Sequence, residues 1–256
     1  ADGRGFFHVR PSDGSGEELL LRHLSREGDA RLPPSAGGPG SGAGLEARVV
    51  DGGRWLVVAS RGQAGERITA VRIDSAGGAL DSTVLLEGQG RHELVGGTDG
   101  RFWFRTAEEA PRGRVVRVDV GAPGRAEEVV PEHEASLVDA FLFGGRLVGY
   151  YLRDARPEVR IFDREGAAER TVELPLGLVF TDYLRDWPGF SGDVRHPHAY
   201  LRSLNPTAPG VYRLDVRTGA VEPFLMRGVE VDASDFVTRH VDFLSADSHK
   251  WLLGPC

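Results

Sequence analysis

An internal repeat of about 45 to 50 residues constrains this chain more than any other feature of its sequence. A tight turn that ends in arginine opens a run of aromatic and β-branched residues four times. These arginines are Arg4, Arg54, Arg101 and Arg146, spaced 50, 47 and 45 residues apart. Repeats of this length are typical of solenoids and propellers, whereas they are not expected of a sandwich or a plain barrel.

A second marker recurs with the same period. It is a short run of basic and apolar residues that ends in aspartate at Asp74, Asp119, Asp163 and Asp215, and a weaker relative ends at Ser25. The aspartates are 45, 44 and 52 residues apart. Two independent markers with one period identify a true repeat.

The repeated runs are predicted to be β-strands, because they are short, rich in β-branched and aromatic residues, and bounded by Gly, Asp and Pro. An Asp-Gly pair before a run supplies the positive φ that a tight hairpin turn needs. Each period has room for two further short strands. The candidates in the second and third repeats are Thr83–Leu86, His92–Val95, Glu127–Val130 and Leu137–Phe143.

Four antiparallel strands in about 45 residues are the content of one propeller blade. The sequence therefore predicts an all-β fold, a β-propeller of about five four-stranded antiparallel blades. No stretch shows an apolar period of 3.6 residues, so helices are expected to be scarce. The chain has 256 residues, of which 40% are hydrophobic, and this length is sufficient for a sizeable core.

Charge and composition exclude several classes of partner. Acidic residues outnumber basic ones, 38 to 31, and no basic patch of the kind that binds nucleic acid stands out. No apolar run approaches the roughly 20 residues of a membrane helix. The single cysteine, Cys256, cannot form an intrachain disulfide, which is compatible with a reducing compartment. We expect a cytoplasmic protein, or a periplasmic one if a leader preceded Ala1.

Several segments resemble, in the correct order, the N-terminal propeller of the prolyl oligopeptidases, a family of serine peptidases. The resemblance runs from about Asp2 to Ser245 and is most specific from Phe102 onward. Its segments are 104–114, 130–134, 151–155, 173–176, 200–215, 231–238 and 241–245. In this family a seven-bladed propeller is inserted ahead of most of an α/β-hydrolase domain. The resemblance therefore implies that the repeats correspond to about the last five of seven blades.

The expected domain organisation follows from where the resemblance ends. Residues 1–245 are expected to form the partial prolyl-oligopeptidase-like propeller, and residues 246–256 a divergent tail in place of the catalytic domain. A frameshift, a premature stop or a truncated gene model would explain such a tail, and so would a genuine stand-alone protein.

No catalytic residues are predicted in this chain. A serine peptidase of this type needs a Gly-x-Ser-x-Gly turn that exposes the nucleophile, followed by Asp and His. The nearest string, 189–193, reads Gly-Phe-Ser-Gly-Asp and lacks the final glycine. We therefore expect the chain to be inactive by itself, and no cofactor is predicted.

Three other motifs favour structural roles. His196 and His198 lack the further ligands that a structural zinc site needs, so a solvated turn is preferred and no metal is predicted. The acidic cluster of Glu127, Glu128, Glu132 and Glu134 around His133 has the composition of acid–base machinery, but its match to a propeller segment favours a structural loop. The glycine-rich segment 36–44 lacks the Gly-Lys-Ser/Thr ending of a phosphate loop and is expected to be a turn.

Arg67 is the one candidate for substrate binding. The resemblance implies that it faces the cavity between propeller and hydrolase and can contact substrate. The alternative is an exposed strand arginine that pairs with Glu66 or with solvent. Exposed pairs of that kind contribute roughly 0–1 kcal/mol.

Two functions follow from these observations. The first is the non-catalytic, substrate-gating propeller portion of a prolyl oligopeptidase, which cleaves short peptides after proline. Its partners would be the α/β-hydrolase catalytic domain and short proline-containing peptides, with no nucleic acid and no membrane. The second is a stand-alone binding or scaffold propeller, because this fold hosts many functions.

Overall fold

The computed structural model describes residues 5–11, 17–23, 29–31, 44–63, 65–73, 79–154, 156–174, 190–203 and 210–226. Several features discussed above lie outside these residues. They are Arg4, Ser25, Asp74, most of the segment 36–44, the segments 231–238 and 241–245, and the whole of 246–256 with Cys256.

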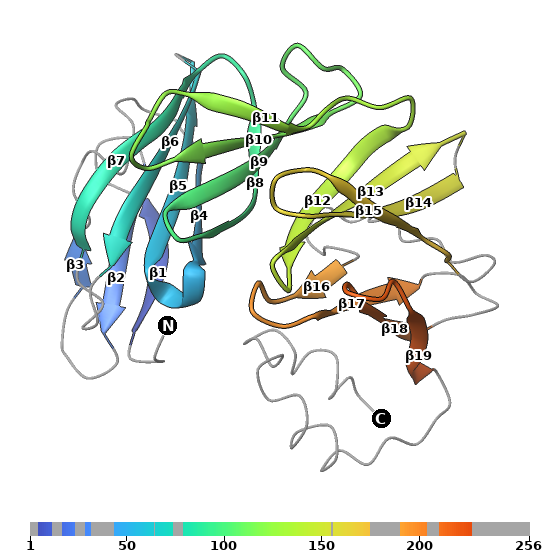
Figure 1. Cartoon of the computed structure of the whole chain (residues 1–256). Helices are drawn as coiled ribbons and strands as arrows, with labels where there is room; N and C mark the ends of the chain where they lie inside the picture. The colour runs from blue at the N-terminus through green and yellow to red at the C-terminus, as the bar shows by residue number, and fades with distance from the viewer. Residues whose placement is uncertain are drawn as a thin grey trace.

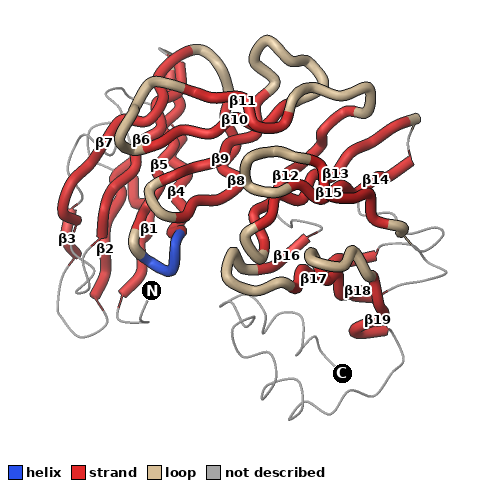
Figure 2. The backbone as a smooth tube through the Cα atoms, viewed as in Figure 1, coloured by secondary structure: helices blue, strands red, loops and turns tan. Residues whose placement is uncertain are grey.

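The described residues form five antiparallel sheets (Figures 1 and 2). The first sheet contains β1 (Gly5–Pro11), β2 (Glu17–His23) and β3 (Asp29–Arg31). The second contains β4 (Gly44–Val50), β5 (Trp55–Gly62), β6 (Gly65–Ile73) and β7 (Ala79–Gly88). The third contains β8 (His92–Thr98), β9 (Arg101–Thr106), β10 (Arg114–Asp119) and β11 (Ala126–Val130).

The fourth sheet contains β12 (Ser136–Phe143), β13 (Arg146–Arg153), β14 (Arg156–Phe162) and β15 (Ala168–Val172). The fifth contains β16 (Phe190–Gly192), β17 (His198–Ser203), β18 (Gly210–Asp215) and β19 (Val221–Met226). The sheets follow one another in an arc, from the first at the left of Figure 1 to the fifth at the lower right. This arrangement confirms the predicted propeller of antiparallel sheets, although the first sheet has three described strands instead of four.

Helix is scarce, as the sequence predicts. The one helical segment within the described ranges is the 3-10 turn η2 (Asp51–Gly53) between β4 and β5. No helix in that part of the chain is long and apolar enough to cross a membrane.

The sheet boundaries fall one strand earlier than the sequence markers suggest. His92–Val95 and Leu137–Phe143 are strands, as predicted, but they begin the third and fourth sheets instead of completing the second and third. The reason is the two-residue turn that follows each of them. Because such a turn reverses the chain directly, the strands on its two sides must pair with each other.

The turn marker has the backbone conformation that the sequence predicts. Between β8 and β9, Asp99 and Gly100 have φ values of 54° and 73°. Between β12 and β13, Gly144 and Gly145 have φ values of 53° and 72°. Positive φ at both central residues is the hairpin conformation that matches the twist of the flanking strands, which explains why Gly and Asp recur at this point.

The aspartate marker terminates the third strand of its sheet. The Oδ1 atom of Asp119 accepts a hydrogen bond from the backbone N–H of Gly121 at 2.8 Å. Asp163 accepts one from Glu165 at 2.9 Å, and Asp215 accepts one from Arg217 at 2.8 Å. An aspartate that bonds the backbone two residues later stabilises a turn, so the same side chain recurs wherever the third strand must end.

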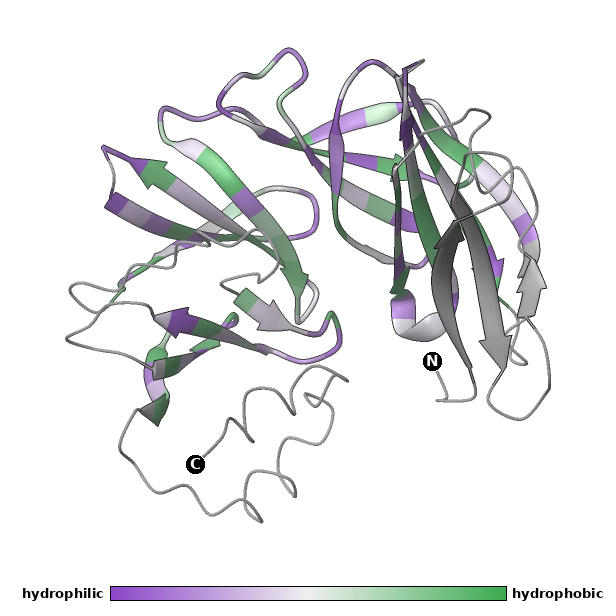
Figure 3. Cartoon of the chain, turned by 180° about the vertical axis from the view of Figure 1, so that it is seen from behind, coloured by the Kyte–Doolittle hydropathy of each residue, from purple (hydrophilic) through white to green (hydrophobic). Residues whose placement is uncertain are grey.

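Both faces of the inner strands are buried where a sheet packs between two neighbours, as the third sheet does. In β9, Phe102 and Phe104 contact the second sheet, whereas Trp103 between them contacts the fourth. All three side chains are at most 1% exposed. Hydrophobic residues accordingly lie along the strands and hydrophilic residues are frequent in the turns (Figure 3). Burial on both faces explains why these strands read as continuous apolar runs instead of alternating ones.

Arginine side chains join the first strands of two sheets to the sheet that precedes each of them. Irregularities in the β8–β9 and β12–β13 ladders follow Leu94 and Leu137. The carbonyl of Leu94 accepts a hydrogen bond from Arg48 of the second sheet at 2.6 Å, and that of Leu137 accepts one from Arg105 of the third sheet at 2.9 Å. The bulged strands are thereby tied to the sheet that precedes them.

Gly166 tests the contact between the third and fourth sheets. Its φ is +89°, and an added Cβ atom would lie 1.8 Å from the carbonyl oxygen of Val129 in β11. We expect Gly166→Ala to lower the free energy of unfolding by more than about 2 kcal/mol, because a left-handed conformation alone costs about 1–2 kcal/mol and the clash adds to it. Chemical denaturation followed by tryptophan fluorescence measures this change.

Gly124→Ala is the matched control. Gly124 has a similar φ of +77°, but an added Cβ would meet no atom within 4 Å. The free energy of unfolding of this variant should fall only by the conformational cost of about 1–2 kcal/mol. Equal losses in the two variants would contradict the close approach of the sheets at Gly166.

Candidate functional site

Arg67 lies near the start of β6, the third strand of the second sheet. Its Nη2 and Nε atoms donate to Oε1 of Glu87 on β7, at 2.6 and 3.2 Å. The two residues are direct cross-strand partners, and their side chains are 28% and 60% exposed. Arg67 therefore pairs with Glu87 and not with Glu66, the partner named in the alternative prediction. Any contact of Arg67 with a substrate would have to share or displace the Glu87 carboxylate.

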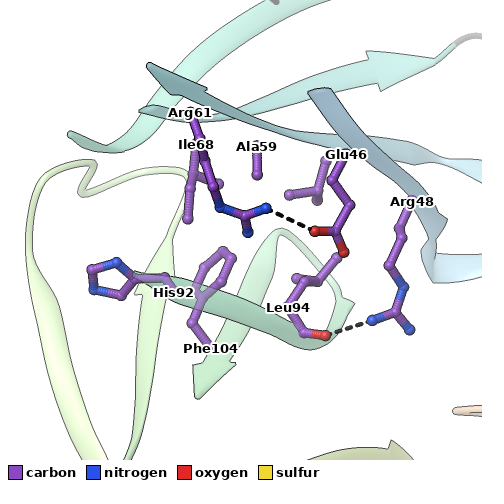
Figure 4. A pocket seen from close by; sticks show the side chains of 9 residues that line it. Glu46, Arg48, Ala59, Arg61, Ile68, His92, Leu94 and Phe104 are labelled. Atoms are coloured by element: carbon purple, nitrogen blue, oxygen red, sulfur yellow. Dashed lines mark hydrogen bonds and ion pairs between the residues drawn. The ribbon is translucent and has the colours of Figure 1, made fainter. Parts of the chain in front are cut away.

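Glu66 points to the opposite face of β6, into the junction between the second and third sheets. Its side chain is only 6% exposed. Oε1 accepts a hydrogen bond from Nε of Arg61 at 2.7 Å, and Nη1 of Arg61 reaches Oε2 of Glu46 at 3.1 Å (Figure 4). Glu66 is therefore a buried carboxylate held by a guanidinium from its own sheet.

His92 completes this junction from the third sheet. Its backbone N–H donates to Oε2 of Glu66 at 2.7 Å, and its ring Nδ1 lies 3.3 Å from the same oxygen. The ring Nε2 lies 3.6 Å from Oε2 of Glu108. Burial alone would raise the pKa of Glu66, but the hydrogen bonds from His92 and the contact with Arg61 outweigh it and hold that pKa below its ordinary value.

The junction leaves no room for a ligand. The cavity beside it measures about 10 Å³, which is the space of roughly one water molecule. It is lined by Glu46, Arg48, Val57, Ala59, Arg61, Ile68, His92, Leu94 and Phe104 (Figure 4). We conclude that the charged side chains at this point hold two sheets together.

Asp139 is a second charged group between sheets, on β12. Burial raises its pKa from 3.8 to about 6, opposed by the hydrogen bond from the N–H of Ala140 and reinforced by the charge of Glu93 on β8. Glu93 itself is paired with Arg105 at 2.6 Å. Asp139 thus carries a charge that the surroundings only partly compensate.

The serine of the 189–193 string does not have the setting of a nucleophile. Ser191 is the central residue of β16 and pairs with Tyr200 of β17 in a regular antiparallel ladder. A nucleophile of the expected type sits on a sharp turn between a strand and a helix. Asp193, at the end of the string, pairs with Arg195 at 2.9 Å.

The two histidines of the metal candidate belong to a turn and to the strand that follows it. His196 lies in the turn after β16, whereas His198 is the first residue of β17, where its Nε2 is 3.9 Å from Oδ2 of Asp215. Across the described ranges, no three His, Cys, Asp or Glu side chains are grouped as metal ligands.

The acidic cluster is divided among separate structural contacts. Glu127 and Glu128 on β11 pair with Arg117 at 2.8 Å and Arg114 at 3.2 Å. In the loop that follows, Nδ1 of His133 accepts a hydrogen bond from the N–H of Ala135 at 3.1 Å. Glu134 lies 3.8 Å from Arg153. These side chains stabilise the ladder and the loop instead of converging on one point.

Comparison with known proteins assigns the family. The family described as "Prolyl oligopeptidase, N-terminal beta-propeller domain" matches residues 41–227, which is most of the chain. The chain belongs to this family. The prolyl oligopeptidase propeller domain is therefore the fold that the arc of sheets represents.

Relatives and solved structures agree with this assignment. The prolyl endopeptidase of Elizabethkingia meningoseptica is 25% identical over 211 residues, which cover 80% of this chain. A prolyl endopeptidase structure from a study of inter-domain dynamics in two such enzymes is 26% identical and covers 90% of this chain with a TM-score of 0.69. Prolyl oligopeptidase B from Galerina marginata, at 15% identity, covers 91% with a TM-score of 0.69 and shows the shared fold.

The chain spans only part of each of these proteins. It covers 28% of the Elizabethkingia meningoseptica enzyme and 35% and 34% of the two solved chains. The shared part is the propeller, so the match describes the domain and not the whole protein.

Sequence reasoning did not find the Glu66–His92 junction. The two residues are 26 positions apart and belong to different sheets, and neither lies in a repeated motif. The available signal was Glu66 itself, a carboxylate in a strand whose next alternate position, Ile68, is apolar and buried. A buried charge at such a position requires a partner.

Asp139→Asn tests the uncompensated charge on β12. A carboxyl whose pKa is higher in the folded state destabilises the protein above that pKa, and the effect fades as the pH falls towards the unfolded value. We expect Asp139→Asn to raise the melting temperature at pH 7.5. The free energy of unfolding should rise by at most about 3 kcal/mol. The gain should vanish near pH 4, because the Asp139 carboxyl is then protonated in the folded protein.

The control is Asp81→Asn, at an aspartate that is 73% exposed and paired with Arg72 at 2.9 Å. Its effect on the melting temperature should be small at both pH values, since exposed pairs contribute about 0–1 kcal/mol. Thermal melts at pH 4 and 7.5 make both measurements. A destabilised Asp139→Asn protein at pH 7.5 would contradict the assignment.

Proposed function

We propose that this chain is the substrate-gating, non-catalytic propeller portion of a prolyl oligopeptidase. The observation that carries the proposal is the family match over residues 41–227. The fold is shared over 90% of the chain with a prolyl endopeptidase of which it covers only 35%. The remainder of such an enzyme would be the α/β-hydrolase domain that cleaves short peptides after proline.

The chemistry would belong entirely to that partner domain. Ser191 lies within an antiparallel ladder and not on the strand-to-helix turn that exposes a nucleophile of this type. The propeller would contribute a wall of sheets that limits which peptides reach the hydrolase. A gate of this kind must be stiff, and the buried junction at Glu66 and His92 supports that stiffness.

Arg67 would be the propeller residue nearest to the substrate. A guanidinium has five N–H donors, and Glu87 accepts from two of its nitrogen atoms. A peptide carbonyl would bind the remaining donors while Glu87 keeps the side chain in place. In this proposal Arg67 positions the peptide and takes no part in bond cleavage.

The purified chain should show no peptidase activity towards a chromogenic peptide that contains proline, because no nucleophile turn is present in its sequence. The release of chromophore is followed at protein concentrations up to about 10 µM, with an active full-length prolyl endopeptidase as the positive control. Activity that an active-serine reagent abolishes would refute the proposal that this chain is non-catalytic.

Arg67→Ala is to be tested in a full-length relative that carries this propeller. We expect KM to rise by about three- to tenfold with little change in kcat, because one or two hydrogen bonds to the bound peptide are lost. Steady-state kinetics on several proline-containing peptides measures both constants.

Arg72→Ala is the matched control for Arg67→Ala. Arg72 lies on the same strand, is 53% exposed and pairs with Asp81 of β7 in the same way. The KM of the Arg72→Ala variant should stay unchanged. If kcat/KM is unaffected by Arg67→Ala across the peptides, Arg67 is a structural residue of the β6–β7 pair.

A further inference from the structure

A cavity of about 490 Å³ lies where the turns of four consecutive sheets meet. The turns between first and second strands supply most of its wall. Its lining residues are Asp51, Gly52, Arg54, Thr98, Gly144, Gly145, Arg164, Val194 and Arg195. A volume of this size lies within the usual range of about 300–1,000 Å³ for ligand pockets.

Three arginines from different sheets line this cavity. Arg54 follows η2 in the second sheet, Arg164 lies in the β14–β15 turn of the fourth, and Arg195 lies in the β16–β17 turn of the fifth. Their side chains are 65%, 47% and 62% exposed. All three guanidinium groups are at least 47% exposed, and two of them are also paired, Arg54 with Asp51 and Arg195 with Asp193.

The one carboxylate in the lining is occupied. Asp51 is 6% exposed and accepts hydrogen bonds from Nη2 of Arg54 at 2.8 Å and from the backbone N–H of Asp99 at 3.1 Å. Oγ1 of Thr98 lies 3.3 Å from it. Asp51 thus holds the wall together and presents little negative charge to the cavity.

The backbone of Arg164 is fixed in position, but the positive charge of its side chain is weakly compensated. Its backbone carbonyl accepts a hydrogen bond from Nε1 of the buried Trp103 at 3.1 Å. The nearest carboxylate oxygen among the described residues is Oδ2 of Asp99, 3.9 Å from Nη1, which is too far for a hydrogen bond. The guanidinium therefore has donors to offer a ligand.

Asp99 shows how a carboxylate is accommodated here. Its side chain is 68% exposed, and its two oxygens lie 3.7 Å from Arg54 and 3.9 Å from Arg164. A carboxylate from a ligand would meet the same guanidinium groups from the cavity side. Planar carboxylates match the fork of an arginine, and each such bond is strengthened by the charges.

We infer that this cavity binds a ligand with several carboxylates, either an acidic peptide or a free polycarboxylate. Arg164 and Arg195 are the main contacts, and Gly145, where an added Cβ would meet no atom within 4 Å, lets the ligand approach the backbone. The choice of a peptide as the source of the carboxylates rests on the proposed function. A long polyanion such as nucleic acid is disfavoured by the net charge of −7.

Binding of a fluorescein-labelled hexaglutamate peptide to the whole chain, followed by fluorescence anisotropy at about 20 mM salt, tests the inference. The Arg164→Gln/Arg195→Gln double variant should raise Kd at least about tenfold, because two charge-assisted contacts are lost. A hexaglutamine peptide should bind at least about tenfold more weakly than hexaglutamate. Raising the salt to about 200 mM should also weaken hexaglutamate binding.

The control variant is Arg72→Gln/Arg213→Gln. It removes two positive charges from arginines that are 53% and 38% exposed and pair with Asp81 and Glu222 on the last strands of their sheets. Its Kd should change less than about twofold. Since all four side chains are at the surface, unchanged thermal melts will show that the variants fold.

Citrate identifies the source of the carboxylates. Displacement of the peptide by citrate assigns the site to free polycarboxylates as well, and a lack of displacement assigns it to peptides; both results support a carboxylate site. Equal binding of hexaglutamine, or an equal loss in the control variant, would overturn it. The measurement needs no peptidase activity, so its failure is distinct from failure of the gating proposal.

Discussion

Face-to-face packing of consecutive sheets is the interaction on which the rest of this structure depends. Each of the three junctions between the second and fifth sheets is an apolar cluster drawn from two sheets, as where Phe102 and Phe104 meet Ile68, or where Tyr150 meets Phe190. A sheet between two neighbours must bury both faces, so strands such as β9 are apolar on both sides. The burial of apolar area is the main driving force for folding, and here it acts between sheets as much as within them.

Polar contacts at the margins of these clusters fix how each sheet is rotated against the next. Glu66 and His92 join the second and third sheets, while Arg117 of the third sheet pairs with Glu165 of the fourth. Apolar packing alone tolerates sliding, whereas hydrogen bonds and ion pairs have directional geometry. The turns of successive sheets consequently meet at defined positions, and this brings Arg54 and Arg164 to one cavity.

In the proposed enzyme the hydrolase domain catalyses and the propeller controls which peptides reach it. This separation of roles agrees with the construction of the propeller. A propeller domain that carries its charged groups in turns and on strand edges can present them to a passing peptide without disturbing its core. Arg67 near the start of a strand and Arg195 in a turn are examples. Function in such folds resides in the side chains placed on the scaffold, and the scaffold itself is shared by proteins of very different activity.

The sequence by itself determined the repeat, the strands and their turns, because these depend on local conformation. The Asp99-Gly100 pair requires positive φ, and Asp119 caps a turn through its own neighbours. Only the tertiary structure decided that Glu66 meets His92 of the next sheet, that Arg67 pairs with Glu87, and that arginines about 110 and 140 residues apart line one cavity. These outcomes depend on pairing between strands and on the rotation between sheets. Both arise from contacts between residues distant in sequence, which no local pattern encodes.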